Sequence, residues 1–298
     1  MTAAVQEGQY AALPNGMRLH YASAGQQGRP LLIFLHGFPE FWYAWHAQLQ
    51  AFGDAYFAVA PDLRGFNLSD MPGDVADYRP RLIQQDIEQL IAHLGYQHCV
   101  MVAHDWGGAI AWNIAISNPQ LLDRLIIINA THPYPFAKGL ASDPVQQQAS
   151  AYMNWLRATG AEQALAKDNF RVLEQLMLGM GRPADHWFDA AMRERYHACW
   201  SHGLAGGVNY YRATPMHPPT DTDPGAARLD LDPALLRCHV PVRVLWGMQD
   251  KALLPSLLDD LPSLVDDLII ERISEASHWV VHEQPQRINQ LIERFLSE

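Results

Sequence analysis

Three side chains that could share a catalytic task, Asp105, Asp250 and His278, each follow a predicted buried strand. Asp105 lies in A-H-D-W-G, where Ala103 and Gly107 stand two residues to either side and allow a tight strand-to-helix turn. Asp250 would hold His278 in one tautomer and stabilise its charged form, which leaves the other ring nitrogen to act as a base. Asp105 alone could be an ordinary helix N-cap, but the three residues in this order favour a catalytic set.

The carboxylate of Asp105 suits one kind of chemistry in particular. It can attack an sp³ carbon that bears a leaving oxygen or halide, and the product of that attack is an ester. Water activated by His278 would then attack the carbonyl carbon of the ester, whereas the ether formed by a serine could not readily be cleaved in this way. We therefore expect alkylation of Asp105 followed by hydrolysis.

Two backbone N–H groups are candidates for the oxyanion hole that such a hydrolysis needs. The segment FLHGFPE (34–40) follows an early predicted strand, and its His36-Gly37 turn would point the N–H of Phe38 into the site. The N–H of Trp106, the residue after Asp105, would complete the pair. The alternative is that 34–40 is only a glycine turn before a helix.

The elements that must position these residues alternate between strand and helix. Short apolar runs predict strands at 31–36, 56–60, 99–103, 124–130, 240–247 and 267–273, and an alternating pattern predicts a half-buried strand at 17–23. Helical periodicity predicts helices at 79–95, 107–118 and 285–296. This order predicts an α/β fold with a mostly parallel central sheet and helices on both faces. Active sites in such folds lie at the carboxyl ends of the strands, where the candidate residues are expected.

The alternation is interrupted by a helical region rich in Trp, Tyr, Met and His. It ends in a stretch rich in Pro, Asp and Thr, which is typical of a connecting loop. We interpret residues 132–228 as a helical cap inserted into a core that is formed by 1–131 and 229–298.

Five segments resemble the epoxide hydrolases of the α/β-hydrolase superfamily: HGFPEFWYAW, DLRGFNLSD, HDWGGAIAW, LWGMQD and SHW. The resemblance runs from about residue 10 to the C-terminus. It implies the α/β-hydrolase fold, whose chain order is nucleophile, acid and histidine. It also implies hydrolysis of an epoxide to a vicinal diol through the Asp105 ester, without a cofactor.

The resemblance further implies two cap tyrosines that donate to the epoxide oxygen. The family's Asn-aromatic-Tyr-Arg pattern matches GGVNYYRA and maps one tyrosine onto Tyr211. A tyrosine on a helix ahead of a glycine turn maps the other onto Tyr152. The substrate pocket is expected to include His36, Pro39, His104, Trp155 and Trp279.

Haloalkane and fluoroacetate dehalogenases share the aspartate nucleophile, so neighbouring residues must decide the leaving group. Haloalkane dehalogenases hold the halide with the Trp after the nucleophile and an Asn in HGNP; this chain has Trp106 but reads HGFP. Fluoroacetate dehalogenases carry arginines after the nucleophile and one helical turn later, and this chain lacks both. A dehalogenase that uses the same ester is the alternative. A ligand-binding homologue without turnover is a further one, disfavoured by the complete set of catalytic residue types.

Composition limits the partners. The formal net charge of −11 argues against binding to nucleic acid or to an anionic membrane. Cys99, Cys199 and Cys238 lack metal-ligand spacing and are typical of reduced thiols. No signal peptide, membrane-spanning stretch or dinucleotide fingerprint is recognised. We expect a cytoplasmic enzyme without metal or cofactor, acting on a small apolar epoxide, either as a monomer or as a homodimer.

Overall fold

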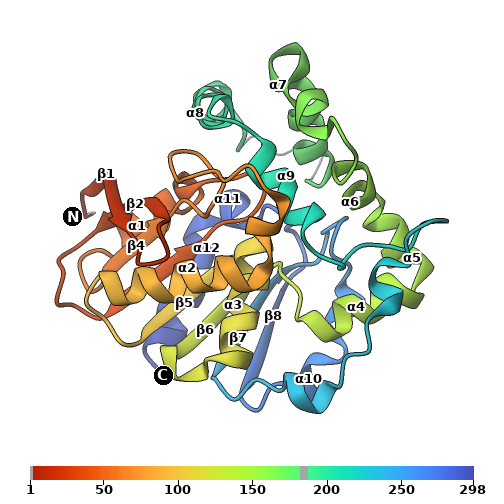
Figure 1. The fold of residues 1–298 in the computed structure, drawn as a ribbon. Coiled ribbons are helices and arrows are strands. Elements are labelled where there is room, and N and C mark those ends of the chain that lie inside the picture. The colour runs from red at the N-terminus through yellow and green to blue at the C-terminus, as the bar shows by residue number, and fades with distance from the viewer. Residues whose placement is uncertain (1–2, 182–186) are drawn as a thin grey trace.

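The computed structural model describes residues 3–181 and 187–298, and an eight-stranded sheet forms its centre (Figure 1). The strands are β1 (Val5–Ala12), β2 (Arg18–Ala24), β3 (Leu31–Leu35), β4 (Phe57–Pro61), β5 (Cys99–His104), β6 (Leu122–Ile128), β7 (Val242–Gly247) and β8 (Leu268–Ile273). Their order in the sheet is β1-β2-β4-β3-β5-β6-β7-β8. The pairs β1–β2 and β2–β4 are antiparallel, and all later pairs are parallel. The predicted mostly parallel α/β sheet is confirmed.

The central strands are those with continuous apolar runs, and β1 is the strand that the sequence analysis missed. Every residue of β3 and β5 is buried, because helices cover both faces of the sheet. Strand β1 is mostly exposed at the edge of the sheet, so its sequence VQEGQYAA shows neither an apolar run nor a clear alternation.

The core helices are α1 (His46–Phe52), α2 (Pro80–His93), α3 (Asp105–Ser117), α10 (Leu261–Leu264), α11 (Val280–Glu283) and α12 (Pro285–Leu296). Helix α2 packs against α3, whereas α1 packs against α12 (Figure 1). The apolar side chains of α2 recur at helical spacing and are buried at Ile83, Ile87 and Leu90. The helix begins with Pro80 and is followed by Gly95 in the left-handed region, so both ends carry ordinary helix signals.

Among the described residues between β6 and β7, six segments are α-helices. They are α4 (Pro133–Ser142), α5 (Pro144–Ala149), α6 (Ala151–Leu156), α7 (Ala161–Gly179), α8 (Ala190–Ser201) and α9 (Ala205–Arg212). Helix α7 is broken at 167–170, where three consecutive residues have positive φ. In Figure 1, α7 and α8 stand clear of the sheet, and α6 and α9 lie between them and the core. These helices fall within 132–228, and the division of the chain into core and cap remains a prediction.

In the part of the chain that the structure describes, no helix has the length and apolar character needed to cross a membrane.

Candidate active site

The strand-to-helix turn between β5 and α3 presents Asp105 at the carboxyl edge of the sheet. Asp105 has a φ of +48°, in the left-handed region that few residues other than glycine adopt. Two glycines make room for it. A Cβ on Gly107 would lie 2.5 Å from the carbonyl oxygen of Leu35, and a Cβ on Gly37 would lie 2.3 Å from the Cβ of Asp105. The small residues noted in the sequence therefore allow two segments to approach more closely than side chains would permit.

One backbone N–H donates to the Asp105 carboxylate, and a second candidate donor follows Asp105 in the chain. The N–H of Phe38 donates to Oδ1 of Asp105 at 2.8 Å, and Trp106 follows in the first turn of α3. The N–H groups of a first helical turn have no acceptor within the helix and lie at the positive end of its dipole. The N-cap residue of α3 is His104, so the alternative that Asp105 is an ordinary N-cap is wrong. These donors can stabilise negative charge on an oxygen bonded to the Asp105 carboxyl carbon.

His278 lies between the two aspartates. Its Nδ1 is 2.7 Å from Oδ2 of Asp250, and its Nε2 is 3.7 Å from Oδ2 of Asp105. Asp250 also accepts hydrogen bonds from the backbone N–H groups of Ala252 at 2.8 Å and Leu253 at 2.9 Å. The structure thus brings together the three residues that the sequence placed after separate strands, and it aims the free imidazole nitrogen at Asp105.

Asn129 is a positioning residue that the sequence analysis missed. Its Nδ2 donates to Oδ2 of Asp250 at 2.8 Å, and its Oδ1 accepts from the N–H of Gly247 at 2.7 Å. Asn129 has a φ of +38° and directly follows β6, between the strands that carry Asp105 and Asp250. The sequence did contain a signal for Asn129, since it is a polar residue directly after a predicted parallel strand. The carboxyl ends of such strands lie at one edge of the sheet, where the active site is expected.

The charges in the site shift the pKa values of the His278–Asp250 pair in opposite directions. Burial alone would lower the pKa of His278, but the charge and hydrogen bond of Asp250, and then the charge of Asp105, raise it to about 9. Burial would raise the pKa of Asp250, but the charge and hydrogen bond of His278 lower it below its usual value. At neutral pH the resting site therefore holds a protonated imidazole between two carboxylates.

Two phenols from different helices face the same carboxylate. Tyr152 comes from α6 and Tyr211 from α9, and their ring centroids are 6.1 Å apart. The ring of Trp106 packs against Tyr211 at 5.1 Å. Burial raises the pKa of both phenols, with a further rise from the charge of Asp105, so both remain protonated. The arrangement can donate hydrogen bonds or a proton to an oxygen that leaves a carbon under attack by Asp105.

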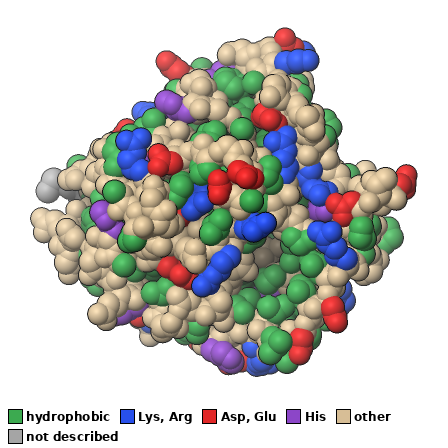
Figure 2. Space-filling model, viewed as in Figure 1, with side chains coloured by type: hydrophobic (Ala, Val, Ile, Leu, Met, Phe, Trp, Pro, Cys, Tyr) green, Lys and Arg blue, Asp and Glu red, His purple; other side chains and the backbone are tan. Residues whose placement is uncertain are grey.

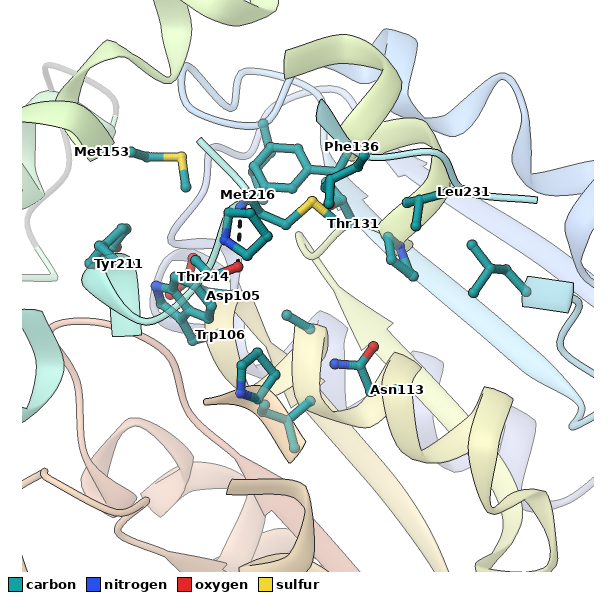
Figure 3. Close-up of a pocket in the computed structure, with 18 of the residues that line it drawn as sticks. Asp105, Trp106, Asn113, Thr131, Phe136, Met153, Tyr211, Thr214, Met216 and Leu231 are labelled. Atoms are coloured by element: carbon teal, nitrogen blue, oxygen red, sulfur yellow. Dashed lines mark hydrogen bonds between the residues drawn. The ribbon is translucent and has the colours of Figure 1, made fainter. Parts of the chain in front are cut away.

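A large apolar cavity, which we call the large arm, opens on one side of Asp105 and has a volume of about 340 Å³. Its lining residues are Pro80, Asp105, Trp106, Ala109, Ile110, Asn113, Thr131, Pro133, Phe136, Tyr152, Met153, Tyr211, Thr214, Pro215, Met216, Leu229, Leu231, Leu236 and Leu253. Figure 3 shows Asp105 and Tyr211 toward one end, with Leu231 and Asn113 toward the other. A hollow bordered by hydrophobic side chains is visible on this face of the molecule (Figure 2).

A second cavity, the small arm, has a volume of only about 10 Å³. Its lining residues are Phe38, Pro39, Asp105, Tyr152, Leu176, Met177, Met180, Tyr211, His278 and Trp279. Pro39 and Trp279, two of the residues expected in the substrate pocket, lie here. The side chains contributed by α7 and the turn after it were missed, because nothing in their sequence distinguishes them from ordinary core positions.

Three residues expected in the pocket do not line either arm. His36 shapes its own turn, with Nδ1 2.8 Å from the carbonyl oxygen of Gly37 and Nε2 accepting from the N–H of Leu63 at 3.0 Å. His104 is buried beneath the site, and its contacts are described below. Trp155 is 42% exposed, because it lies two residues, or about 200° of helix, from the cavity-lining Met153. The expectation that His36, His104 and Trp155 line the pocket is therefore wrong.

A buried carboxylate beneath the site connects three side chains from separate elements. Glu40 accepts from the hydroxyl of Tyr196 at 2.9 Å and lies 3.1 Å from Nδ1 of His104 and 2.5 Å from Nε2 of His282. Burial would raise the pKa of Glu40, but the charge of His282 and the hydrogen bonds of both imidazoles hold it well below its usual value. Nε2 of His104 lies 2.9 Å from the carbonyl oxygen of His278. Both ring nitrogens of His104 thus face acceptors, and this ring supports the backbone that carries His278.

The cysteines lie away from this chemistry. Cys99, Cys199 and Cys238 are buried and free of disulfides, and burial raises the pKa of each thiol. Across residues 3–181 and 187–298, no three His, Cys, Asp or Glu side chains are grouped in a way that could hold a metal ion.

Comparisons with known proteins agree with this geometry. A family model described as the alpha/beta hydrolase fold matches residues 30–285. The chain is 35% identical to AB hydrolase superfamily protein YfhM of Bacillus subtilis, with 95% of each chain covered. It is 34% identical to human Epoxide hydrolase 4, covering 95% of this chain and 77% of that protein.

The solved structures include an epoxide hydrolase of Bacillus megaterium in complex with an inhibitor. That protein is 34% identical to this chain, with a TM-score of 0.88 and coverage of 97% of this chain and 100% of the other. A mutant of the same enzyme has been solved with its product, (R)-3-[1]naphthyloxy-propane-1,2-diol.

Proposed function

The chain belongs to the α/β-hydrolase family and is an epoxide hydrolase-like enzyme, and from this premise we propose that it hydrolyses an epoxide to a vicinal diol through an ester on Asp105. The observation that carries the proposal is that one carboxylate faces both the His278–Asp250 pair and two buried phenols. The product found with the Bacillus megaterium relative is itself a vicinal diol. The proposed substrate is a small apolar epoxide, in keeping with the lining of the large arm.

In the first step, Oδ2 of Asp105 attacks one carbon of the epoxide. A carbon–oxygen bond of the ring breaks, and the departing oxygen takes a proton from Tyr152 or Tyr211. Oδ1 is held by the N–H of Phe38, so it becomes the carbonyl oxygen of the new ester. The attacking oxygen is therefore the one that lies nearer to His278.

The first step prepares the groups needed for the second. The negative charge of Asp105 is one of the causes that raise the pKa of His278 and of both tyrosines. Ester formation removes this charge. The phenols then give up a proton more readily while the alkoxide needs one, and His278 reaches its neutral, basic form more readily.

In the second step, His278 first releases its resting proton to solvent and then takes a proton from a water molecule that attacks the carbonyl carbon of the ester. The N–H groups of Phe38 and Trp106 stabilise the tetrahedral oxyanion. The bond between that carbon and the alkyl oxygen then breaks. The two protons of the water end on the second hydroxyl of the diol and on the tyrosine, and Asp105 returns as a carboxylate.

A dehalogenase that uses the same ester is the alternative function. The side chains beside Asp105 favour an oxygen leaving group, because two phenols line both arms, whereas one of the two indoles there, that of Trp279, already donates its N–H to the carbonyl oxygen of Met177. A halide ion needs no proton when it leaves, whereas an alkoxide does. Release of halide without any diol from an epoxide would favour the alternative.

A single turnover in H₂¹⁸O, with enzyme in excess over 1-octene oxide, tests the ester directly. We expect unlabelled diol and one ¹⁸O atom in the peptide that contains Asp105, because the oxygen delivered to the epoxide comes from the carboxylate. Labelled diol in the first turnover would mean direct attack by water and would overturn the ester.

Two variants serve as controls for this experiment. His278→Gln should carry out the first step alone, so its mass should rise by the mass of one epoxide and little diol should form. Asp105→Asn should gain no such mass. An adduct that forms equally in both variants would place the nucleophile elsewhere.

A further inference from the structure

The two arms of the active site share their reacting groups but differ greatly in size. Asp105, Tyr152 and Tyr211 line both arms. An epoxide ring held between this carboxylate and these phenols therefore lies where the arms meet, and substituents on its two carbons extend toward different arms. The volumes of the arms decide which substituents fit.

The large arm accommodates an extended apolar group, whereas the small arm does not. The small arm has a volume of about 10 Å³, at the lower limit of what one water molecule requires. It is also the arm lined by His278, the base that the second step needs. A water molecule in the small arm would thus lie beside both His278 and Asp105, and a second substituent there would displace it.

Resting on the proposed function, we propose that this enzyme selects monosubstituted, terminal epoxides. The single apolar substituent lies in the large arm, and the small arm holds the hydrolytic water. Asp105 attacks the unsubstituted carbon, the bond from that carbon to the ring oxygen breaks, and the oxygen on the substituted carbon takes the proton of a tyrosine. An epoxide substituted on both carbons in trans has no place for its second group.

The wall that imposes this selection comes from α7 and the turn after it, through Leu176, Met177 and Met180. The indole Nε1 of Trp279 donates to the carbonyl oxygen of Met177 at 2.7 Å, which ties the wall to the loop that carries His278. Nζ of Lys251, the residue after Asp250, donates to the carbonyl oxygen of Gly181 at 2.9 Å. The wall is thus anchored to both loops of the His278–Asp250 pair, so it cannot easily withdraw to admit a second substituent.

Two isomeric substrates test the proposal: 1-octene oxide has a hexyl group on one ring carbon and no substituent on the other, whereas trans-2-octene oxide has a pentyl group on one and a methyl group on the other. A badly placed methyl group typically changes kcat/KM by about 10- to 200-fold, and we expect a preference of this size for 1-octene oxide. After several turnovers in H₂¹⁸O, the label in its diol should lie on the terminal carbon, because that carbon receives the recycled oxygen of Asp105.

A matched pair of variants assigns the preference to the small arm. Met180→Ala enlarges the small arm and should reduce the preference at least about 10-fold, while Met216→Ala enlarges the large arm and should leave it within about twofold. Leu176→Ala replaces Met180→Ala if the latter does not fold. Both methionines are half-buried, so the substitutions are comparable.

Several other results would contradict the proposed selection of terminal epoxides. Equal turnover of the two isomers by the unmodified enzyme, or label on the internal carbon, overturns the selection but leaves the proposed function standing. A preference that Met216→Ala removes and that neither Met180→Ala nor Leu176→Ala changes also overturns it. If neither isomer is opened and Asp105 gains no adduct, the proposed function fails and the selection fails with it.

Discussion

At the scale of single residues, the charge of Asp105 influences the protonation of three neighbouring side chains. The carboxylate contributes to the raised pKa of His278 and of both phenols. His278 lies closest to Asp250, at 2.7 Å, and farther from Asp105, at 3.7 Å. Coulomb interaction falls with distance, so Asp250 holds the imidazolium more strongly than Asp105 does.

This ordering predicts how the pKa of His278 responds to two isosteric substitutions. In the unmodified enzyme we expect a pKa of about 9. Asp105→Asn removes one negative charge and should lower the pKa of His278. Asp250→Asn removes the nearer charge and should lower the pKa of His278 further. NMR titration of the imidazole in the three proteins measures the effect. A His278 pKa that is unchanged in both variants would contradict the charge assignment.

At the scale of elements, the site depends on how closely β3, β5 and α3 approach one another. The nucleophile turn has room only because its neighbours lack side chains. A Cβ on Gly107 would meet the carbonyl oxygens of Leu35 and His36 at 2.5 and 2.6 Å, and a Cβ on Gly108 would lie 2.2 Å from that of Ala130. The contacted atoms at Gly107 are backbone, so they cannot rotate away.

Gly107→Ala should therefore reduce stability although alanine favours helices. We expect a loss of about 1 to 3 kcal/mol in the free energy of unfolding, the usual range for overpacking. Gly73→Ala is the matched control, because no described atom lies within 4 Å of its added Cβ and its φ is not positive. The control should be neutral or stabilise by up to about 1 kcal/mol. Urea denaturation measures both, and an equal effect at the two positions would be evidence against the close approach.

At the scale of the whole molecule, the helices above the sheet are joined to the core by buried hydrogen bonds. Tyr196 of α8 donates to Glu40, which lies in the loop after β3. The indole Nε1 of Trp200, on the same helix, donates to the carbonyl oxygen of Pro39 at 2.7 Å. These bonds fix α8 against the loop that also carries Phe38, so the oxyanion donor and this helix are positioned together.

Tyr196→Phe tests this connection. It removes one donor from a buried carboxylate, and we expect a loss of about 1.5 to 3 kcal/mol in unfolding free energy, as for hydrogen bonds to charged groups. Tyr10→Phe, at a position 43% exposed, should change stability by less than about 0.5 kcal/mol. Chemical denaturation of the two variants compares them directly. Equal stability of Tyr196→Phe and the unmodified protein would mean that Glu40 does not hold α8.

The sequence alone was sufficient for the features that local patterns encode. Apolar runs predicted the central strands, because residues buried on both faces of a sheet must be apolar. The small residues around Asp105 predicted its turn, and chain order predicted that Asp250 and His278 would follow strands of the same sheet. The motif resemblance predicted Tyr152 and Tyr211 as site residues, and both line the small arm together with Asp105.

Only the tertiary structure decided what depends on segments distant in the chain. Strand β1 escaped prediction because an exposed edge has no apolar pattern, and Trp155 was misplaced because composition does not determine which way a helix faces. Asn129 and Glu40 could not be assigned, since their partners lie up to 242 residues away. The two arms have volumes set by the packing of α6, α7 and α9 over the sheet. No local sequence pattern encodes that packing, so the proposed selection of terminal epoxides could be inferred only from the tertiary structure.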